Sequence, residues 1–327
     1  MNHERINEYF NSQLFMIISF LAFAVLAGMA WSSGRFPSLS AQGGIFFAPD
    51  EFLEANGTHS LVATVAINVS VALLLHLLNK VFTFVRTYTF IAASSFVLFQ
   101  ASMPVVSANY YAGSTLALIA VVMAFILFAS YQRKGVSQRS IYLIFTILAT
   151  CATFLYSSIF LIVAFALGFM QMRAMNLKGA LAMLLGIATP FWILLGLGVV
   201  SFSDFRLPEF ERLHSIFSLP QAPVVIISAV GVVILTIILT VVNMVTIFNY
   251  RLQTRVYNAF FTTLATLSVI MMVVDFYNAL IYMPMLNLCL AVQIAHAFTI
   301  AKFAKKHFVY AGGVLILILT YIGNFIL

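Results

Sequence analysis

Charged residues are scarce in this chain: Asp, Glu, Lys and Arg together make up 8% of its 327 residues. Soluble globular domains contain about 25% charged residues, because their surfaces face water. Hydrophobic residues make up 63% of the chain, and the mean hydropathy is +1.07. This composition excludes a soluble globular protein. It predicts a chain whose surface lies in lipid, where helices satisfy their own backbone hydrogen bonds.

Motifs that mark common enzyme and cofactor sites are also missing. The sequence has no phosphate loop of the Walker type, no paired Cys and His at metal-ligand spacing, and no Gly-x-Ser-x-Gly turn. Both cysteines, Cys151 and Cys289, lie in apolar segments, so neither is placed for a disulfide or a metal site. The apolar segments hold no series of acids that would indicate ion coupling. We therefore expect neither a metal nor another cofactor.

Long apolar segments follow one another along most of the chain. A membrane-spanning helix needs about 20 apolar residues. About eleven segments qualify, at 13–33, 60–79, 88–106, 114–131, 141–156, 157–172, 179–201, 223–249, 256–275, 284–301 and 309–326. The predicted fold class is therefore all-α, a polytopic transmembrane helix bundle that forms a single integral membrane domain over residues 1–327.

The stretch 141–172 is too long for one span. As a single helix its 32 residues would extend about 48 Å, whereas a hydrocarbon core is about 30 Å thick. We expect two short segments that break near Ser157 and Ser158. Two interpretations stay open. The pair is either a short or re-entrant element enclosed by the bundle, or two ordinary tilted spans.

The basic residues lie mainly on one side of the predicted helices. Of the 16 Lys and Arg residues, 13 fall in the short gaps on that side or at the N-terminus. The other three, Arg35, Arg206 and Arg212, fall in loops 34–59 and 202–222 on the opposite side, with six of the nine acids. Because Lys- and Arg-rich loops stay in the cytoplasm, this partition predicts a cytoplasmic N-terminus and, after eleven spans, a periplasmic C-terminus.

The same partition bears on location and partners. The net charge of +7 sits in membrane-proximal gaps, where anionic headgroups account for it. The chain has no basic patch with interleaved aromatic residues, so a nucleic-acid partner is not expected. The expected location is the bacterial inner membrane, as a multi-pass protein in contact with membrane lipids.

The first outer loop carries three acids close together. Pro49 followed by Asp50 and Glu51 is a typical helix start, because acids favour the positive N-terminal end of a helix. A short helix from there places Asp50 and Glu54 on one face, four residues apart. Two roles stay open for this segment. It either holds a carboxylate over a lipid-linked substrate or is an amphipathic connector with solvated acids.

The second outer loop alternates charges with Phe and Leu, as an interfacial segment does. Its bases are candidates for binding a phosphate, because an Arg side chain can grip one through two parallel hydrogen bonds; they are Arg206, Arg212 and His214. The alternative is a surface ion pair between Glu209 and Arg212. Both outer loops combine acids with Arg and His, and in the first loop these bases are Arg35 and His59. This convergence favours a binding site on the outer side.

Inside the predicted spans, Asp275 is the only acid. It lies at the outer end of segment 256–275, so it is either an interfacial carboxylate or, turned inward, a member of the outer site. Polar groups within a span usually face protein rather than lipid. Segment 284–301 carries a stripe of such groups, and hydrogen bonds to other helices are their expected role; they are Asn287, Gln293 and His296.

Several stretches of the chain resemble an uncharacterised family of Bacteroidota integral membrane proteins. They are 77–80 (LLNK), 148–158 (LATCATFLYSS), 173–179 (RAMNLKG), 185–192 (LGIATPFW) and 282–285 (YMPM). This resemblance implies a multi-pass membrane fold over most of the chain. It implies no particular activity.

The architecture is also similar to that of polytopic glycosyltransferases of the GT-C type. These enzymes place an acid on a short juxtamembrane helix in the first outer loop and use a polyprenyl-phosphate sugar donor. The similarity implies that Asp50 matches their catalytic acid. The chain differs from them in having no Asp-x-Asp pair, a short first loop and no large periplasmic domain.

Together these features predict a cell-envelope protein that handles a polyprenyl-phosphate-linked saccharide at the periplasmic face. In a transferase, Asp50 would be the general base for an acceptor hydroxyl, with Glu51 or Glu54 in support. The bases Arg206, Arg212 and His214 would stabilise the departing phosphate, and Arg35, His59 and Asp275 would complete the substrate site. Two alternatives are a non-catalytic subunit that docks a membrane protein partner, and a lipid flippase or transporter.

Overall fold

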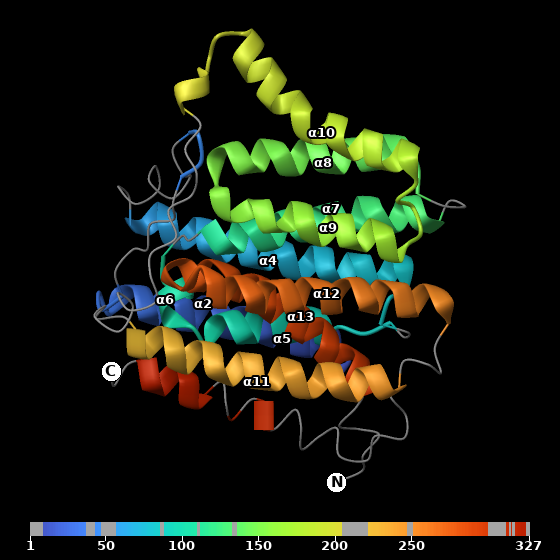
Figure 1. The fold of residues 1–327 in the computed structure, drawn as a ribbon. Coiled ribbons are helices and arrows are strands. Elements are labelled where there is room, and N and C mark those ends of the chain that lie inside the picture. Colours follow the sequence, from blue (N-terminus) through green and yellow to red (C-terminus); the bar gives the residue numbers. More distant parts are fainter. Residues whose placement is uncertain are drawn as a thin grey trace.

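The computed structural model of the chain describes residues 9–36, 43–46, 57–85, 88–109, 112–132, 136–204, 222–246, 251–299, 312–313, 315 and 318–324. The regular elements in these residues are helices, with a single β-bridge between Gly43 and Leu155. The predicted all-α class is therefore confirmed (Figure 1).

Six of the helices in the described residues are long and apolar enough to cross a membrane. They are α2 (Gln13–Ser32), α4 (Gly57–Phe82), α7 (Ala112–Gln132), α10 (Leu177–Gly196), α12 (Leu252–Val274) and α13 (Ala279–Thr299). The other helices beside them are α5 (Ile91–Ala101), α6 (Pro104–Ser107), α8 (Gln138–Phe154), α9 (Ile159–Gln171) and α11 (Ala222–Thr246). The chain is thus a multi-pass membrane protein, whereas the count of eleven spans and their orientation stay predictions.

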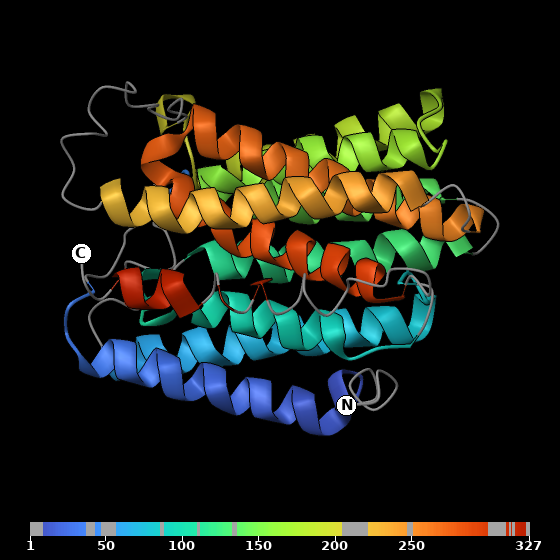
Figure 2. The ribbon, with the colours of Figure 1, turned by 90° about the horizontal axis from the view of Figure 1, so that it is seen from below.

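Helix starts follow local capping rules. The side chain of Ser12 accepts a hydrogen bond from the backbone N–H of Phe15 at the start of α2, and Ser137 does the same for Ser140 at the start of α8. Such caps satisfy N–H groups that the first helical turn leaves free. Figure 1 shows the helices lying side by side with similar axis directions, and Figure 2 shows the same arrangement from below.

The stretch predicted to break near Ser157 and Ser158 forms two helices. Helix α8 ends at Phe154, the 3-10 helix η1 spans Tyr156–Ser158, and α9 begins at Ile159. Both helices keep exposed apolar side chains, among them Leu143 on α8 and Met170 on α9. The pair therefore forms part of the outer surface of the bundle. Whether it crosses the membrane twice stays a prediction.

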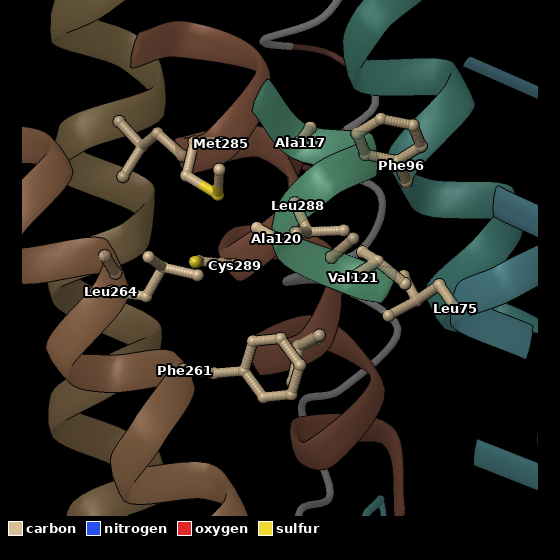
Figure 3. Packing of buried hydrophobic residues seen from close by; sticks show 14 of the residues in the cluster. Leu75, Phe96, Ala117, Ala120, Val121, Phe261, Leu264, Met285, Leu288 and Cys289 are labelled. Atoms are coloured by element: carbon tan, nitrogen blue, oxygen red, sulfur yellow. The ribbon is translucent and has the colours of Figure 1, made fainter. Parts of the chain in front are cut away.

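The enclosed helix is α13. Every residue from Ala279 to Phe298 is buried. Figure 3 shows Met285, Leu288 and Cys289 of α13 in the core, with side chains from α4, α5, α7 and α12 around them. The helix contains no Asp, Glu, Lys or Arg, which suits such a central position.

Contacts between distant segments define one end of the bundle, here called the acidic end. The Trp31 indole donates to the Gly57 carbonyl at 3.1 Å, which joins the end of α2 to the start of α4. The Asn109 amide donates to the Phe36 carbonyl at 3.1 Å. The rings of Phe160 on α9 and Tyr282 on α13 lie 5.3 Å apart. The acidic end thus gathers the starts of α4, α9 and α13.

The opposite end, here called the basic end, is held together by aromatic contacts. Phe84 lies 5.4 Å from Phe261, and Phe128 stacks on Tyr257 at 4.1 Å. Six of the Lys and Arg residues that the structure describes belong to this end: Lys80, Arg139, Arg173, Lys178, Arg251 and Arg255. The remaining one, Arg35, lies at the acidic end. Among the described residues, Lys and Arg therefore gather mainly at one end of the bundle, whereas the partition of the whole chain stays a prediction.

Candidate functional site

A group of buried polar side chains lies at the acidic end, where α12, α13 and η1 meet. The Tyr282 hydroxyl donates to Oδ2 of Asp275 at 2.8 Å, and the Asn278 amide donates to Oδ1 at 3.0 Å. The Ser157 hydroxyl donates in turn to the Tyr282 oxygen. We call these four residues the Asp275 cluster. It joins two segments that are more than 100 residues apart in the sequence.

Local structure positions the cluster. Helix α12 ends at Val274, and the 3-10 helix η5 (Phe276–Asn278) leads into α13. Asp275, Asn278 and Tyr282 are spaced three and four residues apart, which puts their side chains on one face of a helical path. The ring of Phe160 packs edge-on against Tyr282. These contacts hold the Asp275 carboxyl group turned inward, with 6% of the residue exposed.

The carboxyl group is held by neutral partners. Within the described part of the chain, no Lys or Arg side chain forms an ion pair with Asp275, and its side-chain partners are Asn278 and Tyr282. Burial of a carboxyl group is costly unless it is hydrogen-bonded. Each of its oxygens has more than one lone pair, so each can accept a further hydrogen bond. The cluster therefore has acceptor capacity left for a ligand.

The first outer loop docks beside this cluster. The Gly44 N–H donates to the Phe154 carbonyl at 3.0 Å, and the Phe46 N–H donates to the Thr153 carbonyl at 2.9 Å. These bonds satisfy carbonyls that the end of α8 leaves free. A side chain at Gly44 would collide with the Thr153 carbonyl, so the close approach requires glycine. The segment that precedes Asp50 is thus anchored next to η1.

A second polar group crosses the bundle on another side of α13. The Asn287 amide donates to Oε1 of Gln100 at 2.9 Å, and the Gln100 amide donates to Oδ1 of Asn68 at 2.8 Å. The Asn68 amide ends the series at the Thr64 carbonyl and the Ser114 hydroxyl, at 2.9 and 3.2 Å. We call Asn68, Gln100 and Asn287 the amide chain. It links α4, α5 and α13 inside the bundle.

The amide chain lies beside a break in a helix. Helix α5 ends at Ala101, one residue after Gln100, and the short α6 starts at Pro104. Between them, Met103 has a non-helical backbone, and its sulfur accepts a hydrogen bond from Asn287 at 3.6 Å. Non-helical backbone within a membrane protein is tolerated where protein surrounds it. The amide chain therefore braces an interruption in the span predicted at 88–106.

The expected role of the polar stripe on α13 is confirmed for two of its members. Asn287 bonds to α5, as described above. The Gln293 amide donates to Asn258 and Thr262 of α12, both at 3.2 Å, and its backbone carbonyl accepts from Asn243 of α11 at 2.9 Å. These are hydrogen bonds between helices. His296 is fully buried, with its ring 6.4 Å from that of Phe84.

Most of the site residues predicted from the sequence lie outside the described residues. These are Asp50, Glu51, Glu54, Arg206, Arg212 and His214. Of the other three, Arg35 is exposed just after α2 and His59 is exposed in the first turn of α4. Asp275 is buried and turned inward, and its membership of the outer site stays a prediction. All three belong to the acidic end.

Sequence reasoning missed the partners of Asp275. The spacing of Asp275, Asn278 and Tyr282 was a usable signal, because it puts one acid and two hydrogen-bond donors on one helical face. No spacing in the sequence indicates that Ser157, from a distant turn, joins the Asp275 cluster. Of the three members of the amide chain, the sequence predicted hydrogen bonds to other helices for Asn287 only. Among the described residues, no three His, Cys, Asp or Glu side chains gather as metal ligands.

Comparison with known proteins leaves the function open. No family model, no curated protein and no solved structure matches the chain. The resemblances to a Bacteroidota membrane family and to GT-C glycosyltransferases therefore stay predictions.

Proposed function

We propose that this multi-pass protein of the bacterial inner membrane handles a polyprenyl-phosphate-linked saccharide at the periplasmic face, as a GT-C-like glycosyltransferase. The observation that carries the proposal is the inward-turned Asp275 beside the docked first outer loop. A buried carboxyl group within a membrane bundle marks a functional site by default, because it is costly to keep there.

The position of the first loop supports a shared site. The segment that carries Asp50, Glu51 and Glu54 starts after Phe46 and ends before Gly57. Phe46 is bonded to the end of α8, and Gly57 to Trp31, so both anchors belong to the acidic end. In the proposed reaction, Asp50 removes the proton from the acceptor hydroxyl, and that oxygen attacks the anomeric carbon of the sugar. The bond from the anomeric carbon to the phosphate oxygen breaks, and polyprenyl phosphate leaves.

The departing phosphate needs positive charge where its negative charge develops. Arg206, Arg212 and His214 supply it in this proposal, because they belong to segment 202–222, which the charge distribution predicts on the outer side. Arg is suited to this role because its planar group forms two parallel hydrogen bonds to phosphate. The long apolar surface of the bundle suits the polyprenyl chain.

Native mass spectrometry of the protein, extracted gently from its own membranes, tests the proposal. We expect a bound polyprenyl phosphate or lipid-linked saccharide on the wild-type protein. The double variant Arg206→Ala and Arg212→Ala loses this lipid, whereas Arg139→Ala, a matched change at the basic end, keeps it. Asp50→Asn keeps the lipid and the fold but abolishes transfer.

Three results would each contradict a part of the proposal. A stoichiometric protein partner without a polyprenyl lipid would indicate a non-catalytic subunit. Full transfer activity in Asp50→Asn would remove the catalytic role of that residue. Movement of the lipid across proteoliposome bilayers, equal in wild type and Asp50→Asn and without transfer, would indicate a flippase. The amide chain beside the break after α5 is the structural support for that alternative.

A further inference from the structure

The Asp275 cluster differs chemically from the predicted phosphate-binding loop. Its side chains are one carboxyl group, two hydroxyl groups and one amide, and no cation belongs to it among the described residues. A second hydroxyl on the same turn, that of Ser158, is fully buried and has no hydrogen-bond partner among the described residues. A phosphate would find no positive charge here and would meet a carboxyl group instead. A polyhydroxyl group finds both donors and acceptors.

We propose that the Asp275 cluster is the subsite that holds the hydroxyl groups of the saccharide, while the phosphate is bound elsewhere. This inference rests on the proposed function and names the part of the substrate that the cluster recognises. The carboxyl oxygens of Asp275 accept hydrogen bonds from sugar hydroxyls through the lone pairs that Tyr282 and Asn278 leave free.

The burial of the cluster fits a subsite at the edge of the bundle. Ser157, Asp275 and Asn278 each keep 6–7% exposure, whereas Tyr282, deeper along α13, keeps 1%. The exposed edges belong to the acidic end, where the Gly43–Phe46 segment of the first loop docks. A site built to pair with hydroxyl groups rejects a ligand that lacks them, because its buried polar groups then stay unpaired.

Binding of two lipids by the purified full-length chain tests this assignment. The probes are polyprenyl phosphate and the same lipid carrying one hexose, titrated against the protein in nanodiscs. We expect wild type to prefer the hexose-bearing lipid by about tenfold or more, the effect of one good hydrogen bond. Asp275→Asn and Tyr282→Phe lose this preference but bind polyprenyl phosphate as wild type does, which shows that they are folded. Asp204→Asn, a change of an exposed acid, keeps the preference.

Other outcomes would overturn the inference in distinguishable ways. If Asp275→Asn keeps the preference for the hexose, the saccharide is read by other residues. If wild type binds both lipids equally, the cluster does not recognise the sugar, although the proposed function survives. If wild type binds neither lipid, the inference and the proposed function both fail.

Discussion

Replacement of Gln100 by alanine is expected to destabilise the helix bundle, because Gln100 joins the other two members of the amide chain. Gln100 is the middle member of the amide chain and is 1% exposed. Its side chain accepts from Asn287 at 2.9 Å and donates to Asn68 at 2.8 Å. The alanine variant removes both bonds and leaves a buried donor and a buried acceptor unpaired.

The magnitude follows from these two losses. Hydrogen bonds between membrane helices contribute about 0.6 kcal/mol on average and up to about 1.7 kcal/mol. A buried polar group left unpaired costs roughly 1–3 kcal/mol. Because α4, α5 and α13 meet around the Gln100 side chain, water has little access to the groups that the alanine variant leaves unpaired. We expect a loss of about 2–4 kcal/mol in the free energy of unfolding.

The matched control is Gln171→Ala. Gln171 also donates one side-chain hydrogen bond to another helix, at Thr263 of α12, but it is exposed at the end of α9. Its unpaired partner remains accessible to solvent or headgroups, so we expect a loss below about 1 kcal/mol. The comparison isolates burial, because the two variants delete the same atoms.

Unfolding in mixed detergent micelles, followed by circular dichroism, measures both variants. Thermal labelling of the fully buried Cys289 with a thiol dye, in a Cys151→Ser background, reports the opening of α13 independently. The double variant Gln100→Ala and Asn287→Ala should lose less stability than the sum of the single variants, because they share one bond. Equal midpoints for Gln100→Ala and Gln171→Ala would refute the reasoning.

Two further predictions concern α10 and the orientation. Gly186→Ala should loosen α10 from α8 and lower the melting temperature by several degrees, because its Cβ would lie 2.7 Å from the Tyr142 carbonyl oxygen. The control is Gly196→Ala, whose Cβ would meet nothing within 4 Å and which should leave the melting temperature unchanged. A similar effect of both changes would contradict the close packing of the two helices. In a cysteine-free background, a membrane-impermeant maleimide should label His59→Cys in intact spheroplasts. It should label Lys178→Cys only after the membrane has been permeabilised. The reverse pattern would invert the predicted orientation.

Much of the fold could be predicted from local properties of the chain. Each segment partitions into lipid according to its own hydropathy, so the all-α class and the positions of the helices followed from the composition of successive stretches. The break after Phe154 was readable because 32 apolar residues exceed one membrane thickness. The gathering of Lys and Arg at one end was readable because charges stay in the loops.

The candidate site was less predictable because its members come from separate segments. Asn68 and Gln100 are 32 residues apart, and Gln100 and Asn287 are 187 residues apart. The rotation of each helix about its axis decides whether such side chains meet, and hydropathy says little about rotation in helices that are apolar on all sides. The same holds for the meeting of Ser157 with Tyr282.

Hydropathy and charge along the chain were therefore sufficient to establish a membrane bundle with one basic and one acidic end. Tertiary structure decided that α13 is the enclosed helix, that Asp275 turns inward, and that the amide chain crosses the bundle beside the break after α5. The physical reason is that partition into lipid is summed over one segment, whereas burial and hydrogen bonding of a polar group depend on which neighbours the packed helices bring to it.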